Sequence, residues 1–188
     1  MPAKKPGYVR QYIGDRDVGA LHPSSRFLVR RLIRCLRPGP IRTIVEFGPG
    51  PGVATRPLLE SLPADARYIA IEKNPAFLAA LKSSIADPRL SVVEGDACSV
   101  REILSSQGIA TADAIIASIP FSFLSEEQRV GLIDAVWSLL ADDGDFVIFH
   151  QFTPLMLSLV KKRFPRVRVL FEPRNIMPCF LIHCRKKT

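Results

Sequence analysis

The chain has 188 residues, a hydrophobic fraction of 47%, a charged fraction of 23% and a formal net charge of +8. These values are those of a globular domain and exclude a disordered chain, and no apolar run approaches the ~20 residues that cross a bilayer. The opening sequence Met1-Pro2-Ala3-Lys4-Lys5 lacks the apolar core of a signal peptide, so we expect one domain over residues 1–188, in the cytoplasm.

The positive charge is concentrated at the two ends of the chain. Residues 1–37 hold nine Lys/Arg and two Asp, and residues 161–188 hold nine Lys/Arg and one Glu, which leaves eight basic and fifteen acidic residues between them. Basic ends on an acidic body predict that the termini meet an anionic surface, either nucleic-acid phosphate or lipid headgroups. Solvated helix faces are the alternative interpretation.

Residues 1–37 are predicted to form a basic helical extension. Ser24 or Ser25 is expected to cap a helix over residues 27–36, in which apolar residues recur at helical spacing while arginines take the other faces. We expect this amphipathic helix to pack on the domain, although the same pattern suits a membrane surface. The stretch from Lys4 to Tyr12, with two tyrosines among cations, is the better candidate for an interfacial segment.

A glycine-rich loop follows the first predicted strand. The apolar run from Ile41 to Phe47 predicts a buried strand, a helix is expected over residues 53–62, and Gly48-Pro49-Gly50-Pro51-Gly52 lies between them. Glycines let the backbone turn and approach a ligand where a side chain would block it. The G-x-G-x-x-G fingerprint of dinucleotide-binding proteins is not met, because Val53 occupies the place of its third glycine.

Two further strands end at acidic residues. The apolar run Tyr68 to Ile71 stops at Glu72, 24 residues after Gly48, about where nucleotide-binding folds place a carboxylate that accepts hydrogen bonds from ribose hydroxyls. Asn74-Pro75 is then expected to start a helix that runs to Ile85. The next strand begins at Leu90 and closes on Gly95-Asp96, where capping of a helix over residues 99–106 is the alternative role of the acid.

The rest of the chain continues the alternation of strand and helix. Ser125 to Gln128 forms a capping box, Trp137 is expected in the core, and residues 142–145 are expected to form a turn. The remaining elements are expected at residues 114–117 (strand), 126–140 (helix), 146–149 (strand), 153–164 (helix), 167–171 (strand) and 179–184 (strand). This order predicts an α/β, Rossmann-like fold: a mostly parallel seven-stranded sheet with a C-terminal antiparallel hairpin, helices on both faces, and a ligand at the carboxyl ends of the strands.

Four features together resemble the class I S-adenosylmethionine (SAM) methyltransferases, over the chain from about Ile41 to its end: Glu46-x-Gly48-x-Gly50-x-Gly52, Glu72, Gly95-Asp96, and the loop Ser118-Ile119-Pro120-Phe121. The resemblance implies SAM as the cofactor, with the ribose on Glu72, the adenine amine on Asp96, a ring nitrogen on the adjacent backbone amide, and the methyl donor facing the loop from Ser118. The implied cofactor-binding residues are Glu46, Gly48, Gly50, Gly52, Glu72, Lys73, Asp96, Ala97, Ser118, Ile119 and Pro120. No metal is expected, since the cysteines lack metal-site spacing.

Within that superfamily, the residues from Glu46 to Gly52 and the upstream His22-Pro23-Ser24-Ser25-Arg26 resemble the bacterial phospholipid N-methyltransferases, which are relatives of the rRNA adenine dimethyltransferases. The adenine enzymes carry Asn/Asp-x-Pro-Tyr/Phe where this chain has Ser118 to Phe121, and they carry an additional C-terminal helical domain. The resemblance implies methylation of a lipid amine such as that of phosphatidylethanolamine, at the inner face of the membrane. The alternatives are an RNA base methyltransferase, with stacking on Phe121, and a SAM-binding protein without catalysis.

The proposed reaction requires a proton acceptor. A lipid amine arrives protonated and must lose that proton before its nitrogen attacks the sulfonium methyl. The residues expected at the acceptor end are Tyr8, Tyr12, His22 and Ser118, and His150 at a strand end is a further candidate for the proton acceptor. The sequence does not choose among them.

Overall fold

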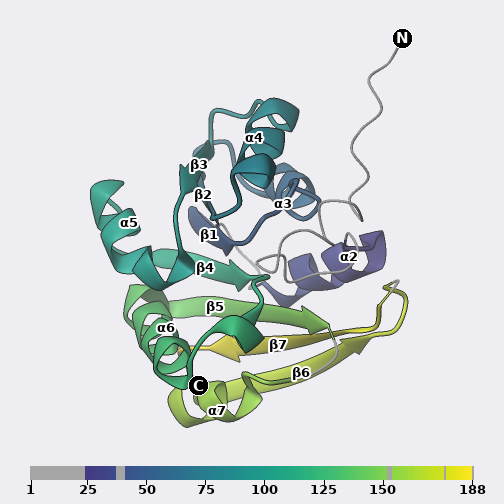
Figure 1. The fold of residues 1–188 in the computed structure, drawn as a ribbon, viewed down its shortest axis with the longest axis vertical. Helices are drawn as coiled ribbons and strands as arrows, with labels where there is room; N and C mark the ends of the chain where they lie inside the picture. The colour runs from purple at the N-terminus through teal and green to yellow at the C-terminus, as the bar shows by residue number, and fades with distance from the viewer. Residues whose placement is uncertain (1–23, 37–40, 152–153, 176, 188) are drawn as a thin grey trace.

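The computed structural model describes residues 24–36, 41–151, 154–175 and 177–187 (Figure 1). The strands are β1 (Thr43–Phe47), β2 (Arg67–Glu72), β3 (Leu90–Glu94), β4 (Ala112–Ala117), β5 (Leu140–Gln151), β6 (Arg166–Glu172) and β7 (Cys179–Arg185). The helices are α2 (Arg26–Cys35), α3 (Thr55–Ser61), α4 (Pro75–Ser84), α5 (Val100–Ser106), α6 (Glu126–Leu139) and α7 (Leu157–Arg163), with short 3₁₀ turns η1 (Ala97–Ser99) and η2 (Phe121–Phe123).

The strands form one seven-stranded sheet with the order β3-β2-β1-β4-β5-β7-β6. The pairs β2–β3, β1–β2, β1–β4 and β4–β5 are parallel, whereas β7 is antiparallel to both β5 and β6. The predicted parallel sheet with a C-terminal antiparallel hairpin is therefore confirmed. Because β1 to β4 run in one direction, their carboxyl ends meet at one edge of the sheet, which is where parallel sheets bind ligands.

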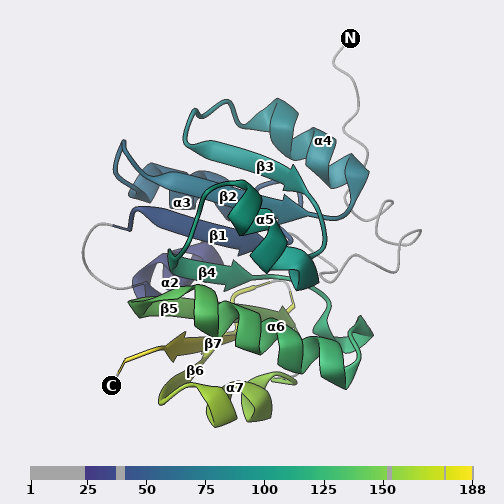
Figure 2. The ribbon, with the colours of Figure 1, turned by 90° about the vertical axis from the view of Figure 1, so that its left-hand side faces the viewer.

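Helices cover both faces of the sheet, as predicted. Strand residues alternate between two apolar cores: Val45 contributes to the core under α5, α6 and α7, and Ile44 to the core under α2, α3 and α4. Figure 2 shows α5 and α6 in front of the sheet. Alternating burial on both faces explains why the central strands are continuous apolar runs in the sequence.

The helix starts follow the capping signals of the sequence. The Ser25 hydroxyl accepts the Leu28 N–H, and the Asn74 side chain accepts the N–H groups of the first turn of α4. At the start of α6, Ser125 and Gln128 form the predicted reciprocal capping box. These side chains satisfy backbone donors that the first helical turn leaves unpaired, which fixes the three boundaries locally.

Two boundaries of the second half differ from the prediction. Residues 142–145 were expected to form a turn before the fifth strand, but β5 already begins at Leu140. The β4–β5 register jumps from Ala112↔Leu140 to Ala114↔Asp145, so the intervening residues bulge out of the ladder without ending the strand. The helix expected from Thr153, a residue outside the described ranges, begins at Leu157 instead, because the Leu157 N–H bonds to the Pro154 carbonyl in a preceding turn.

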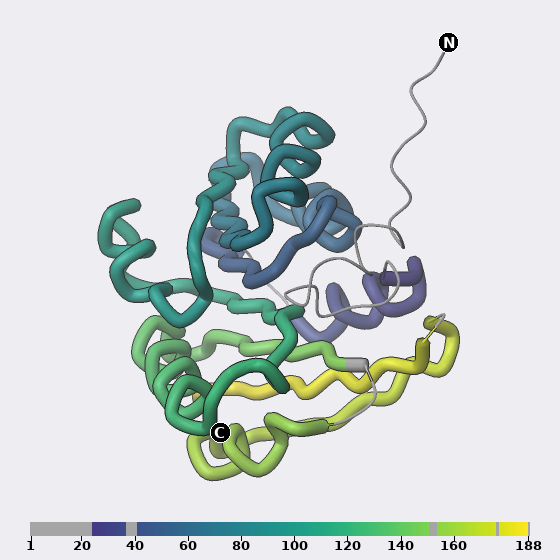
Figure 3. The backbone as a smooth tube through the Cα atoms, in the orientation of Figure 1, coloured from purple at the N-terminus to yellow at the C-terminus, as the bar shows by residue number. Residues whose placement is uncertain are grey.

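Helix α2 packs on the domain, as the sequence predicted. Its residues Leu28, Val29, Leu32 and Cys35 are buried against the sheet. Figure 3 shows that this early helix lies beside the β6–β7 hairpin at the end of the chain, and both hairpin strands contact it. In the portion of the chain that the structure describes, none of the helices combines the length and apolar character required to cross a membrane.

Candidate functional site

A cavity opens at the carboxyl ends of β1 to β4. Four separate segments supply most of its lining, and each lies at the carboxyl end of one strand: residues from 46–54 at β1, 71–73 at β2, 95–97 at β3 and 118–120 at β4. All four motifs that the sequence singled out therefore meet in one place. The parallel arrangement of the strands brings them together, although up to 74 residues of sequence separate them.

The glycine loop is held tightly between two neighbouring strands. The Gly48 N–H donates to the Ile71 carbonyl (3.0 Å), and the Ser118 N–H donates to the Phe47 carbonyl (2.9 Å). Gly48 adopts φ +68°, and a Cβ atom there would lie 2.7 Å from the Ser118 carbonyl oxygen. Glycine is thus required at this position both by the positive φ and by the close approach of the Ser118 carbonyl.

Gly52 has a different role from the two glycines before it. It is buried but is not among the residues that line the cavity. A Cβ atom at this position would lie 2.6 Å from Leu81 Cδ1 and 3.0 Å from Ile85 Cδ1. Its small size therefore lets the loop pack against α4, which supports the loop from behind.

Glu72 connects the glycine loop to the end of β2. Its Oε2 accepts the Gly50 N–H (3.0 Å) and its Oε1 accepts the Asn74 N–H (2.8 Å). The residue is only 6% exposed and lines the cavity. A carboxylate fixed in this way at a strand end is suited to accept hydrogen bonds from ligand hydroxyls.

Asp96 caps a 3₁₀ turn and also lines the cavity. Its Oδ1 accepts the Cys98 N–H (2.9 Å) and caps η1, while its Oδ2 lies 3.5 Å from Lys73 Nζ. Partial burial works against the charged form, but the Cys98 amide and the Lys73 ammonium hold the pKa of Asp96 below its ordinary value. Asp96, Lys73 and Ala97 all line the cavity, so the cap does not remove the acid from the site.

Glu46 is a buried carboxylate at the floor of the cavity. It is 1% exposed, and its Oε2 accepts two hydrogen bonds, from the hydroxyls of Thr55 (2.7 Å) and Tyr68 (2.6 Å). Burial raises the pKa of Glu46, the two hydroxyls partly offset this, and the nearby Glu72 raises it further, so that the pKa is about 7. Neither partner was predicted from the sequence; the available signal was a tyrosine inside an otherwise aliphatic strand.

The part of the cavity formed by the loop after β4 is largely apolar. Ser118, Ile119 and Pro120 line it as predicted, and Phe121 is fully buried behind them. Further lining residues were not predicted from the sequence: Ser24, Phe123, Leu124, Gln128 and Phe149. Phe123 is 59% exposed and so places an aromatic ring at the mouth of the cavity.

Three of the predicted acceptor residues, Tyr8, Tyr12 and His22, lie outside the described residues. Ser24, two positions after His22, lines the cavity. His150 lies on β5, with its ring centroid 6.1 Å from that of Phe121, and is not among the lining residues. In the described ranges, no three or more His, Cys, Asp or Glu side chains are grouped so that they could hold a metal ion.

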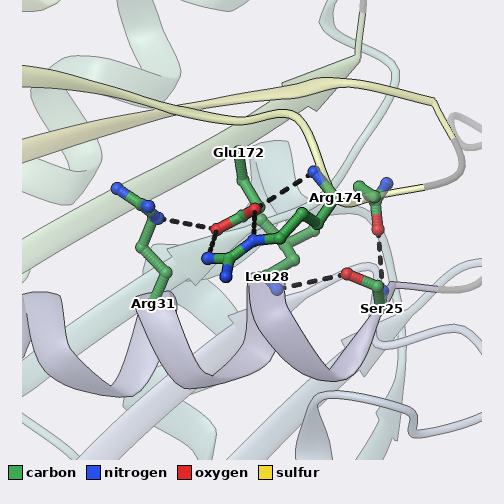
Figure 4. Close-up of polar contacts among 6 residues, drawn as sticks. Ser25, Leu28, Arg31, Glu172 and Arg174 are labelled. Carbon is green, nitrogen blue, oxygen red and sulfur yellow. Dashed lines mark hydrogen bonds and ion pairs between the residues drawn. The ribbon is translucent and has the colours of Figure 1, made fainter.

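The β6–β7 hairpin anchors the start of α2 beside the cavity (Figure 4). The Ser25 N–H donates to Asn175 Oδ1 (2.7 Å), next to the lining residue Ser24. Arg31 and Arg174 both donate to the buried carboxylate of Glu172, at 2.9 Å and 2.8 Å. Figure 4 shows the two guanidinium groups converging on this acid.

Glu172 should make the stability of the protein depend on acid pH. The Arg174 and Arg31 guanidinium groups lower its pKa from 4.5 to about 2. An acid with a lowered pKa stabilises the folded state above its unfolded pKa, and this contribution is lost as pH falls from about 4.5 to about 2. We expect Glu172→Gln to lower the melting temperature at neutral pH, and the difference from wild type to shrink over that window.

Thermal unfolding followed by circular dichroism at a series of pH values measures this effect. Glu60→Gln, on the exposed face of α3, serves as the control and should leave the melting temperature unchanged. A difference between wild type and Glu172→Gln that stays constant from neutral pH to pH 2 would contradict the assignment of the ion pairs.

A methyltransferase domain family matches residues 44–144 of the chain. Among curated relatives, an ornithine lipid N-methyltransferase of Singulisphaera acidiphila is 30% identical over 169 residues, covering 89% of this chain and 88% of the relative. A ribosomal RNA small subunit methyltransferase A of Caulobacter vibrioides is 38% identical over 97 residues, covering 50% of this chain but 35% of the relative.

The fold is also that of solved methyltransferases. The structure of a precorrin-6y C5,15-methyltransferase from Geobacter metallireducens superposes with a TM-score of 0.69, at 17% sequence identity, and covers 87% of this chain and 88% of the other. At that identity the match concerns the fold alone.

Proposed function

The chain belongs to the class I SAM-dependent methyltransferases, and from this premise we propose that it transfers the SAM methyl group to the amine nitrogen of a lipid headgroup. The observation that carries the proposal is the extent of the similarity. The lipid enzyme matches over 89% of this chain and 88% of its own length, whereas the rRNA enzyme matches 50% of this chain and 35% of its own length.

The cavity fits SAM. Gly48 lets the loops after β1 and β4 approach each other closely, and the ends of β2 and β3 carry the acids Glu72 and Asp96, which line the same space. In this proposal Glu72 binds the ribose hydroxyls, Asp96 and the Ala97 amide bind adenine, and Glu46 binds the amino group of the methionine part. Bound SAM supplies an electrophilic methyl group on a sulfonium centre. The protein contributes the alignment of the donor and the acceptor.

The acceptor amine is proposed to lie against Ser118, Ile119 and Pro120. The apolar side chains around them, Phe123, Leu124 and Phe149, would keep bulk water from the reacting nitrogen. The segment before Ser24 carries Tyr8, Tyr12 and His22, and the position of Ser24 at the cavity supports a role for that segment at the acceptor. One of these side chains, or Ser118, would take up the amine proton.

A peripheral position on the inner face of the membrane forms part of the proposal. Helix α2 has no acidic residue, and its arginines Arg26, Arg30 and Arg34 are exposed. Each cation close to an anionic surface contributes about 1 kcal/mol of binding free energy. The basic ends of the chain would in this way hold the acidic body of the enzyme at the lipid headgroups.

Methylation of an RNA adenine is the second candidate, and the identity of 38% over the cofactor-binding half favours it. The loop at Ser118 counts against it. The rRNA adenine dimethyltransferases, which this chain resembles, have an Asn or Asp at that position that accepts a hydrogen bond from the adenine amine, and this chain has a serine.

Incubation with radiolabelled SAM and, separately, phosphatidylethanolamine, ornithine lipid and total RNA tests the proposal. We expect label in lipid. Label in RNA alone overturns the proposal, and SAM binding without any labelled product indicates a non-catalytic protein.

We expect Tyr68→Phe to weaken SAM binding at pH 7 about tenfold and to move its pH dependence upward. The Tyr68 hydroxyl lowers the pKa of Glu46, which burial has raised to about 7. Without this hydrogen bond the carboxylate ionises at higher pH, and binding of a cationic amino group follows that ionisation. A hydrogen bond to a charged group contributes about 1.5–3 kcal/mol, which corresponds to a tenfold or larger change in affinity.

Isothermal titration calorimetry across neutral pH, on wild type and Tyr68→Phe, measures this shift. Thr111→Val removes an exposed hydroxyl and serves as the control. A purely structural role of Tyr68 would lower the melting temperature without moving the pH profile. An unmoved profile would therefore refute the proposed role of Glu46.

A further inference from the structure

A row of aromatic side chains crosses the sheet from the acceptor loop to its outer edge. Its members are Phe121, His150, Phe180 and Phe171, which we call the aromatic row. His150 on β5 lies opposite Phe180 on β7, and Phe180 lies opposite Phe171 on β6. The ring centroids are 6.1 Å apart for Phe121 and His150 and 5.1 Å apart for Phe171 and Phe180. Directly opposed residues point to the same face, so the row is continuous.

The row begins buried and ends exposed. Phe121 is 0% exposed, but Phe171 is 48% exposed, and Val169, which shares its face of β6, is 41% exposed. Strand β6 is the edge of the sheet. Adjacent exposed apolar side chains on an edge strand favour aggregation unless they have a binding role, so their presence marks a contact surface.

We propose that the exposed end of the aromatic row, Phe171 together with Val169, binds the hydrocarbon chain of the acceptor lipid while its headgroup amine lies at the loop from Ser118 to Phe121. The inference rests on the proposed function and adds where the lipid tail lies. Three strand spacings of about 4.8 Å separate Phe121 from Phe171, roughly 14 Å in total. That length suits a fatty chain and exceeds the needs of a bare headgroup.

Cations flank the row on its own face of the sheet. The β6 arginines Arg166 and Arg168 alternate with Val169 and Phe171 and therefore point to the opposite face. On the face of the row, helix α7 ends in Lys161, Lys162 and Arg163. An apolar strip beside these cations complements a lipid with an anionic headgroup. Binding of RNA phosphates to the same cations is the alternative that the test separates.

The double variant Val169→Thr/Phe171→Ser tests the inference. We expect KM for the lipid acceptor, presented in non-ionic detergent micelles, to rise at least tenfold. Methylation of the matching chain-free headgroup, phosphoethanolamine or ornithine, and the Kd for SAM should stay at the wild-type values. Val130→Thr is the matched control, because Val130 is also 41% exposed but lies on α6 outside the row, and its KM should not change.

Each other outcome overturns the inference in a recognisable way. An unchanged lipid KM in the double variant removes the tail site and leaves lipid methylation by the wild type standing. An equal loss for the headgroup or for SAM shows general damage to the site. If the double variant binds vesicles that lack the acceptor lipid more weakly than wild type does, while its KM in micelles is unchanged, Val169 and Phe171 anchor the protein to the bilayer and do not bind the tail of the acceptor. If the double variant loses methylation of RNA, Val169 and Phe171 belong to an RNA-binding surface. If the wild-type protein methylates no lipid, the proposed function is refuted as well.

Discussion

A Gly48→Val variant is expected to lose SAM binding, with affinity reduced at least about 100-fold. A Cβ atom at this position would lie 2.7 Å from the Ser118 carbonyl oxygen and 3.0 Å from Ile119 Cγ2. The φ of +68° is also strained for a β-branched residue, at a cost of about 1–3 kcal/mol. The loops after β1 and β4 would have to separate, and both of them line the cavity. Calorimetric titration with SAM, together with circular dichroism to verify folding, measures the effect.

Gly108 offers a matched control for the backbone strain alone. It has φ +64°, similar to Gly48, but a Cβ atom there would meet no atom within 4 Å. Gly108→Val should therefore lower the melting temperature and leave the SAM affinity unchanged. Wild-type SAM affinity in a folded Gly48→Val protein would show that the glycine loop does not hold the cofactor.

The meeting of the four motifs in one cavity was predictable because they lie at the carboxyl ends of strands of a parallel sheet. The sequence shows an apolar run ending at each of Glu46-Phe47, Glu72, Asp96 and Ser118, and parallel strands place their carboxyl ends at one edge. The short-range pattern was therefore sufficient to predict a long-range arrangement. The structure confirms the sheet and brings all four segments to one cavity.

The residues that support the site were not predictable in the same way. Tyr68 reaches Glu46 from the neighbouring strand, and Asn175 binds the Ser25 amide across 150 residues of sequence. Such contacts depend on strand register and on the packing of α2, and no local periodicity reports either of these. Gly52 illustrates the reverse problem, since the motif spacing grouped it with the glycines expected to bind the ligand, while its close neighbours are Leu81 of α4 and Ile85 just after it.

The sequence pattern also does not distinguish phenylalanines that line the cavity from phenylalanines of the core. Phe149 lies near the end of β5 and Phe123 in the turn η2, and an apolar sequence pattern is equally compatible with a core position for both. In the structure Phe149 is 8% exposed and Phe123 is 59% exposed, yet both line the cavity. The aromatic row has the same origin, because its four rings come from four segments that become neighbours only through the order β5-β7-β6.

Glu72→Ala should reduce SAM affinity by roughly 10²–10⁴-fold while the protein stays folded. In the proposed site this carboxylate accepts hydrogen bonds from two ribose hydroxyls, each worth about 1.5–3 kcal/mol, and a loss of both corresponds to that range. The same carboxylate accepts the Gly50 N–H (3.0 Å) and the Asn74 N–H (2.8 Å), so its removal also loosens the glycine loop. Calorimetric titration with SAM at neutral pH measures the loss.

The Glu94→Ala variant is the control that distinguishes the loss of a direct contact with SAM from the loss of a negative charge at this edge of the sheet. It lies directly opposite Glu72 in the β2–β3 register, is exposed, and is not among the residues that line the cavity. Glu94→Ala should therefore bind SAM as wild type does. If Glu72→Ala and Glu94→Ala lowered the affinity equally, the effect would come from the charge of this edge of the sheet, and the ribose contact assigned to Glu72 would be wrong. A loss confined to Glu72→Ala means that the acid acts through direct contacts, since two carboxylates at the same strand level contribute similarly to the long-range field.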